Sequence, residues 1–175
     1  MTGEWPKTVT FAEVSRGSMV LDLTADDVSK RKAAKTLGLE AINSLKATVK
    51  LAQWLDGVEM KGKLRASVVQ TCSVTAESLP AKIHGEFVLR LLPPGSPNAP
   101  TTESPELDIE ADADDVPDVL EGEVIDVSAY VIEHLALELD PFPRKEGAEF
   151  EQPPEPVDLS PFAALKALSK PKADE

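Results

Sequence analysis

The 175-residue sequence has few of the side chains that build metal centres and covalent cross-links. Its one cysteine, Cys72, excludes an internal disulfide and a cysteine-based zinc site within a single chain. Its two histidines, His84 and His134, are fifty residues apart, and the sequence has no second ligand cluster at metal-binding spacing. We therefore expect no metal and no cofactor. We also expect Cys72 to be a buried, unreactive residue on the apolar face of a strand.

Signatures of catalysis and of membrane insertion are missing as well. The sequence contains no Ser/His/Asp arrangement, phosphate-binding loop or glycine-rich dinucleotide fingerprint. Residues 1–11 lack the apolar core of a signal peptide, and no apolar run approaches the roughly 20 residues of a membrane span. These absences predict a cytoplasmic protein that is not an enzyme.

Charge is distributed unevenly along the chain, whose net charge is -13. Residues 1–93 carry 13 basic and 10 acidic side chains, whereas residues 94–175 carry 5 and 21. Such asymmetry indicates contact with nucleic acid or an acidic segment that meets a basic partner. Proline and acidic residues dominate the stretch after Leu92, which predicts a mobile acidic loop over 94–120 and disorder over 94–115.

Alternating apolar and polar residues predict strands over Ser18–Leu23, Ser44–Leu55, Val58–Val74 and Ala81–Leu92. Asp56-Gly57 is typical of a two-residue hairpin turn, which would place Leu55 opposite Val58 and Lys50 opposite Lys63. The fold class is therefore α+β, an antiparallel meander with an Asp-Gly hairpin. One or two helices would pack on its apolar face, and an acidic loop and a proline-rich C-terminal tail would follow.

Helical spacing predicts one helix that is capped by Thr24 and stops at Gly38, and a second over Asp126–Leu139. Asp126 or Ser128 would cap the second helix, and Pro141 would end it. The expected organisation is a single domain over 1–143 and a proline- and glutamate-rich tail over 144–175, with a short helix opening at Ser160. The basic residues near the end of the first helix are expected to form a solvated face: Lys30, Arg31, Lys32 and Lys35.

The polar face of the expected sheet is strongly basic. Its members, which we take as candidate RNA-binding residues, are Lys46, Lys50, Trp54, Lys61, Lys63, Arg65, Lys82 and Arg90. Lysines and arginines bind phosphate, and an exposed tryptophan can stack on a base. Two other interpretations stay open: a lysine-rich wet face that keeps the sheet soluble, or a face that the acidic segment neutralises.

Two stretches carry a family resemblance: KGKLRASVVQTCSVTAESLPAKIHGEFVLRLLP from Lys61, and IDVSAYVIEHLALELDPFPRK from Ile125. In this order they resemble the YceD family of bacterial proteins. QTCSVTAESLPAKI and DPFPRKEGAEF are similar to its alphaproteobacterial branch. Cys72 matches the first cysteine of the family's Cys-x-Arg-Cys element, but Ser73-Val74-Thr75 follow it. Arg144 stands after Pro143, where many members have another cysteine, so metal binding does not transfer to this chain.

The resemblance implies a role in accumulation of 23S ribosomal RNA, and it implies no catalytic residues. The leading hypothesis is a non-enzymatic factor in large-subunit biogenesis that binds ribosomal RNA or a pre-ribosomal particle. The alternative is an acidic binding module that holds a basic large-subunit ribosomal protein before assembly. Neither hypothesis involves a membrane.

Overall fold

The computed structural model describes residues 2–3, 5–100 and 116–150. Its main element is a six-stranded sheet in the order β1-β3-β4-β5-β6-β7. Four long strands follow one another in sequence and pair antiparallel: β3 (Met19–Thr24), β4 (Ala41–Trp54), β5 (Gly57–Thr71) and β6 (Ser78–Leu92). The predicted α+β meander is therefore confirmed. Two short strands, β1 (Thr2–Gly3) and β7 (Asp118–Val119), pair parallel at its edges.

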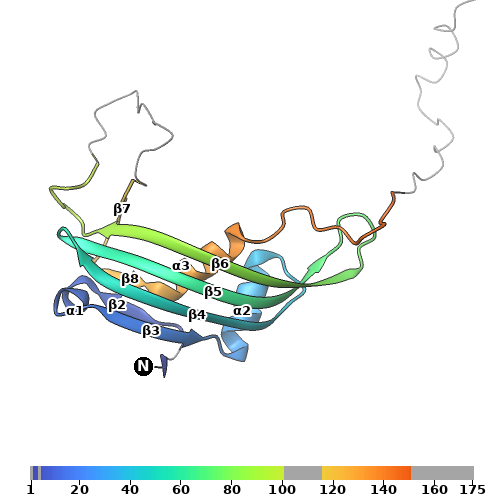
Figure 1. The fold of residues 1–175 in the computed structure, drawn as a ribbon, viewed down its shortest axis with the longest axis horizontal. Helices are drawn as coiled ribbons and strands as arrows, with labels where there is room; N and C mark the ends of the chain where they lie inside the picture. Colours follow the sequence, from blue (N-terminus) through green and yellow to red (C-terminus); the bar gives the residue numbers. More distant parts are fainter. Residues whose placement is uncertain (1, 4, 101–115, 151–175) are drawn as a thin grey trace, which may run out of the picture.

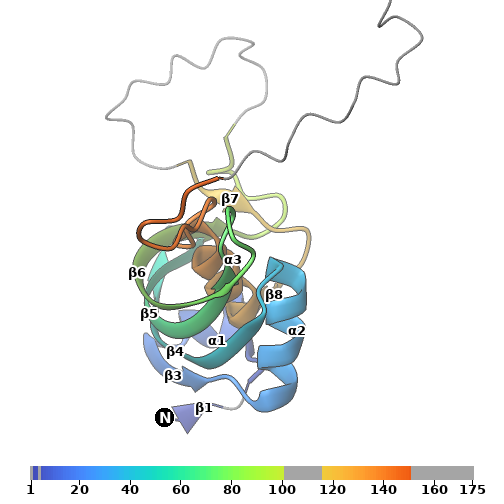
Figure 2. The same cartoon turned by 90° about the vertical axis from the view of Figure 1, so that its right-hand side faces the viewer.

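Two helices lie on one side of the sheet, as Figures 1 and 2 show. They are α2 (Asp27–Leu37) and α3 (Val127–Leu137). A small second sheet, formed by β2 (Thr8–Thr10) and β8 (Val124–Asp126), leads into α1 (Phe11–Ser15) and α3. Viewed along the strands, the long strands curve around α3, and α2 lies beside it (Figure 2). The sheet thus has an inner face covered by helices and an outer face on which none of the described helices lies.

The inner face and the helices share one apolar core. Val49, Val68, Val131 and Leu135 are fully buried, and Leu64 is nearly so. Alternate residues of a strand point to opposite sides, so every second residue of β4, β5 and β6 enters this core. Valine and leucine dominate these positions because burying such a side chain contributes about 1.5–3 kcal/mol.

Both main helices begin at an aspartate. The Asp26 carboxylate accepts a hydrogen bond from the Ser29 backbone N–H at 2.7 Å, so α2 starts two residues later than the predicted Thr24 cap. Thr24 instead ends β3. Gly38 has a φ of 66° and ends α2, as predicted, because glycine adopts this left-handed conformation without strain. Asp126 caps α3 by accepting from the Ala129 N–H at 3.0 Å.

The hairpin between β4 and β5 turns one residue earlier than predicted. Trp54 pairs with Gly57, so Leu55 and Asp56 form the turn, and Leu55 takes a φ of 52°. Gly57 belongs to β5 for a packing reason: a Cβ there would lie 2.0 Å from the Leu91 carbonyl oxygen on β6. The predicted register is therefore wrong by two residues, and Lys50 lies opposite Lys61 rather than Lys63. A shift of two residues leaves every side chain on its predicted face.

The start of the predicted mobile loop folds over this hairpin. Ser96 Oγ and Asn98 Nδ2 donate hydrogen bonds to the Asp56 carboxylate at 3.0 and 2.8 Å. Both hydrogen bonds lower the pKa of Asp56, and the bond from Asn98 has the larger effect. Near the other end of the loop, β7 pairs with β6. Residues 101–115 of that loop and the helix predicted to open at Ser160 lie outside the described residues.

Candidate nucleic-acid interface

The structure places all the candidate RNA-binding side chains on the outer face of the sheet, opposite α2 and α3. From strand to strand they are Lys46, Lys50 and Trp54 on β4; Lys61, Lys63 and Arg65 on β5; and Lys82 and Arg90 on β6. Strand alternation produces this grouping, because each of these residues is offset by an even number of positions from its neighbours on the same strand. We call this set the basic face.

Like charges lie directly opposite one another within the basic face. Lys50 pairs in register with Lys61, and Lys46 pairs with Arg65. Directly opposed like charges destabilise a sheet, typically by a few tenths of a kcal/mol to about 1 kcal/mol. The arrangement therefore costs folding free energy, and an external anion would offset that cost.

Three carboxylates interrupt the basic face: Asp22, Glu59 and Glu86. Lys61 Nζ lies 2.8 Å from Glu59, and Lys63 Nζ lies 2.8 Å from Glu86. Asp22 accepts a hydrogen bond from the Thr48 hydroxyl at 2.7 Å. The Lys63 and Glu86 side chains are 73% and 72% exposed, so water screens this pair and an incoming phosphate can replace it.

For other cations of the basic face, no such carboxylate lies among the residues that the structure describes. Over residues 5–100 and 116–150, no ion pair involves Lys46, Lys50, Arg65 or Lys82. All four are exposed. Positive charge that no neighbouring acid neutralises is what a phosphate backbone requires of its binding surface.

Trp54 and Arg90 form a stack at the hairpin end of the face. The Arg90 guanidinium carbon lies 5.1 Å from the centroid of the Trp54 ring, which is a cation–π arrangement. Arg90 Nε is also 4.0 Å from Glu59. Trp54 is half-buried and the Arg90 guanidinium carbon lies over its ring, so the outer surface of the pair includes arginine as well as indole.

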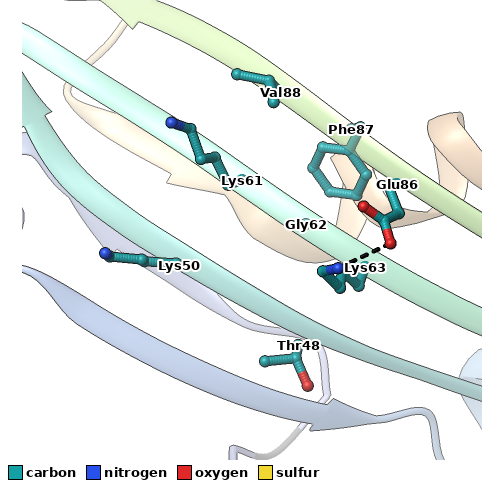
Figure 3. A pocket seen from close by; sticks show the side chains of 8 residues that line it. All are labelled: Thr48, Lys50, Lys61, Gly62, Lys63, Glu86, Phe87 and Val88. Carbon is teal, nitrogen blue, oxygen red and sulfur yellow. Dashed lines mark hydrogen bonds and ion pairs between the residues drawn. The ribbon is translucent and has the colours of Figure 1, made fainter.

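A hollow of about 400 Å³ opens in the middle of the basic face, above Gly62. Lys50, Lys61 and Lys63 surround it, with Val88 on the β6 side (Figure 3). Val88 is not among the candidate residues predicted from the sequence. The sequence does place Val88 on this face, because it is separated from Lys82 and Arg90 on β6 by an even number of positions.

Cys72 lies at the opposite end of the sheet, one residue beyond β5. It is 2% exposed, so the predicted burial is correct. Its sulfur accepts hydrogen bonds from the backbone N–H groups of Lys145 at 3.4 Å and Thr75 at 3.5 Å. The Thr75 side chain, followed by these and neighbouring N–H groups, lowers the thiol pKa to about 6. The sequence analysis did not predict this, because Lys145 is remote in sequence.

Lys145 ties the chain after α3 to this corner. Its ammonium lies 2.9 Å from Glu77, and this contact lowers the pKa of Glu77 and raises that of Lys145. Ser73 N–H donates to the Pro143 carbonyl at 2.8 Å. In the part of the chain that the structure describes, no cluster of three or more His, Cys, Asp or Glu residues is placed to hold a metal. No described helix is long and apolar enough to cross a membrane.

Comparison with known families gives a match over residues 60–169, to the family described as large ribosomal RNA subunit accumulation protein YceD. The matched region spans more than half of the chain and includes most of β5, all of β6 and α3, and the Cys72 corner. No curated protein and no solved structure matches the chain.

Proposed function

Because the chain belongs to the YceD family of large ribosomal RNA subunit accumulation proteins, we propose that it supports accumulation of that RNA by binding it. In this proposal the protein is a cytoplasmic, non-enzymatic factor in large-subunit biogenesis. Its partner is ribosomal RNA, either free or within a pre-ribosomal particle. The description of the family supplies the link to the RNA, and direct contact with RNA is our inference.

The observation that supports RNA contact is the basic face. The chain carries a net charge of -13, yet seven of its 18 Lys and Arg residues lie on one side of one sheet. A lysine-rich surface for solubility alone would not require opposed pairs such as Lys46 and Arg65, which cost stability. Bound phosphates would turn these pairs into favourable sites, because each phosphate would lie between two cations.

A second candidate function rests on the excess of acid in residues 94–175, which carry 21 acidic and 5 basic side chains. Such a segment would attract a basic ribosomal protein and hold it before assembly. In that case the acidic segment, and not the basic face, would be the binding element. The two candidates therefore predict opposite results when cations are removed from the face.

The test removes one opposed pair, Lys46→Ala with Arg65→Ala, and measures binding of in vitro transcribed large-subunit ribosomal RNA over a salt titration. The plot of log affinity against log salt should become less steep by about 0.7–0.9 for each phosphate that the variant no longer neutralises. The matched control is Lys32→Ala with Lys35→Ala, which removes the same charge from the exposed surface of α2.

The proposal requires the face variant to bind more weakly and with a smaller slope, while the helix variant binds as the parent protein does. Equal weakening in both variants would mean that only net charge matters. An unchanged face variant would remove the basic face from consideration. Retained binding of a basic ribosomal protein by that variant would then favour the acidic holding module.

A further inference from the structure

We infer that the basic face takes single-stranded rather than duplex RNA, with one unpaired nucleobase in the hollow above Gly62. This inference rests on the proposed function and adds the class of RNA and the contacts that select it. It depends on three features of the outer face: the chemistry of the hollow, the width of the cationic stripe and the Arg90–Trp54 stack.

The hollow exists because the residues at its floor point the other way. Gly62 has no side chain, and a Cβ there would lie 2.1 Å from the Phe87 ring. The buried Phe87 ring stacks on His134 of α3, with 4.1 Å between ring centroids and 5° between ring planes. The floor is therefore sheet backbone supported from below by an aromatic pair. Such a rigid floor does not have to be ordered when a ligand binds.

The walls of the hollow combine apolar surface with positive charge. Val88 is 48% exposed, a large fraction for valine within a sheet. Lys50, Lys61 and Lys63 contribute aliphatic stems along the walls and ammonium groups at the rim (Figure 3). An inorganic anion would use only the rim, and an apolar ligand would use only the walls. A nucleotide uses both, because the π-face of its flat base packs on apolar surface and its phosphate is anionic.

The cationic stripe at the hollow is the width of one nucleic-acid backbone. Lys61, Lys63 and Arg65 follow β5 with successive side chains roughly 7 Å apart, since a strand rises about 3.4 Å per residue. Lys50 lies beside them on β4. The flanking strands present neutral or acidic residues at this level: Val20 and Asp22 on β3, and Glu86 and Val88 on β6.

A duplex presents two phosphate backbones and keeps its bases stacked inside the helix. On this face its second backbone would lie over Asp22 or Glu86, and no base could reach Val88. A single strand has one backbone and can turn a base toward the protein. Four residues further along β4 from Lys50, the guanidinium of Arg90 over Trp54 offers a planar surface on which a second base can stack.

The test compares a 12-nucleotide fluorescein-labelled RNA as a single strand and as a duplex with its complement, by anisotropy across a salt series. We expect the single strand to bind at least tenfold more tightly. Val88→Ser should weaken single-strand binding roughly fivefold, the scale of removing a half-buried valine side chain, and leave the salt slope unchanged. The matched control is Val20→Ser, since Val20 is 49% exposed on the same face but outside the hollow.

Val88→Thr keeps the branched shape of valine, so it controls for a loss of folded structure in Val88→Ser. Thermal melting checks that all three variants are folded. Long-chain polyphosphate, a polyanion without bases, should bind Val88→Ser and the parent protein equally. The inference is overturned if the duplex binds as tightly as the single strand, or if Val88→Ser and Val20→Ser behave alike. In either case RNA binding itself would stand. Absence of binding to both RNAs would overturn the inference and the proposed function together.

Discussion

The two faces of the same strands are under different constraints. Lys63 and Leu64 are neighbours on β5, yet the Lys63 side chain is 73% exposed and Leu64 is 1% exposed. The inner face is filled by close-packed apolar side chains, where the loss of one methylene is felt. The outer face carries opposed like charges that lower stability. The comparison indicates that packing selects the inner residues, whereas the proposed binding of RNA would account for the outer ones.

The largest expected effect comes from breaking the inner face. Leu64→Ala should lower the free energy of unfolding by about 2–5 kcal/mol, because it removes buried methyl groups and leaves a cavity. Urea denaturation followed by circular dichroism measures this change. The protein that remains folded should bind RNA with unchanged affinity, because Leu64 does not reach the outer face.

Its matched control is the adjacent Lys63→Ala. This change should alter the unfolding free energy by no more than about 0.5 kcal/mol, since the Lys63–Glu86 pair is exposed. RNA binding should weaken in this variant. If Lys63→Ala destabilised the fold as much as Leu64→Ala, the division of roles between the two faces would be wrong.

An effect smaller than that of Leu64→Ala is expected at Gly62, whose backbone lies between the hollow on the outer face and Phe87 on the inner face. In Gly62→Ala, the new Cβ would displace the Phe87 ring from its stack on His134, at a cost of about 1–3 kcal/mol. Phe87→Leu removes the ring that the Cβ meets, so adding Gly62→Ala to that variant should cost less. Additive costs in the double variant would show that Phe87 is not the obstacle.

The sequence predicted the two faces correctly even though it predicted the turn wrongly. Alternation depends only on whether positions are odd or even, so a register error of two residues left Lys46, Lys50 and Arg65 on the outer side. The turn itself was ambiguous because Gly57 follows Asp56. Glycine there serves close approach to Leu91, which is a contact between strands distant in sequence. Local turn statistics contain no information about such a contact.

The short elements were harder to predict. β1, β2, β7 and β8 have two or three residues each and exist only through pairing with distant strands. α1 did have a local signal that the sequence analysis missed. Thr10 and Glu13 form a capping box, in which the Glu13 carboxylate accepts from the Thr10 N–H at 2.7 Å. The hollow could not be predicted, because it depends on which side chains of β4, β5 and β6 lie beside one another across the sheet.

Cys72 lies at the end of the inner face, where polar contacts replace apolar packing. Its thiol pKa is about 6 in the folded protein and near 9 when unfolded. A lowered pKa contributes stability that is fully present above pH 9 and is lost as pH falls through 6. Thermal melting should therefore show a stability increase between these pH values in the parent protein that is absent from Cys72→Ala.

The thiolate can be observed directly, because the chain has no other cysteine. Absorbance near 240 nm in the folded protein should titrate with a midpoint near pH 6, and Cys72→Ala should remove the transition. Cys72→Ser keeps an acceptor for the Lys145 and Thr75 N–H groups and should melt above Cys72→Ala at low pH. A midpoint above pH 8 would show that these N–H groups do not stabilise the thiolate.

A small effect on stability is expected at Lys50, where it should have the opposite sign to the effect on binding. Lys50→Glu places a carboxylate directly opposite Lys61, so a repulsive pair becomes attractive and the fold should gain about 0.2–1 kcal/mol. RNA binding should fall further than in Lys50→Ala, because a negative charge then stands beside the hollow.

Reversing the partner as well, with Lys61→Glu, restores like charges and should cancel the gain in stability without restoring binding. The parent protein, Lys50→Glu, Lys61→Glu and the double variant form a double-mutant cycle. Urea denaturation measures the stability of each protein, and RNA affinity is measured at one salt concentration. Stability and binding changing in the same direction across this cycle would mean that the outer face, like the inner face, serves the fold.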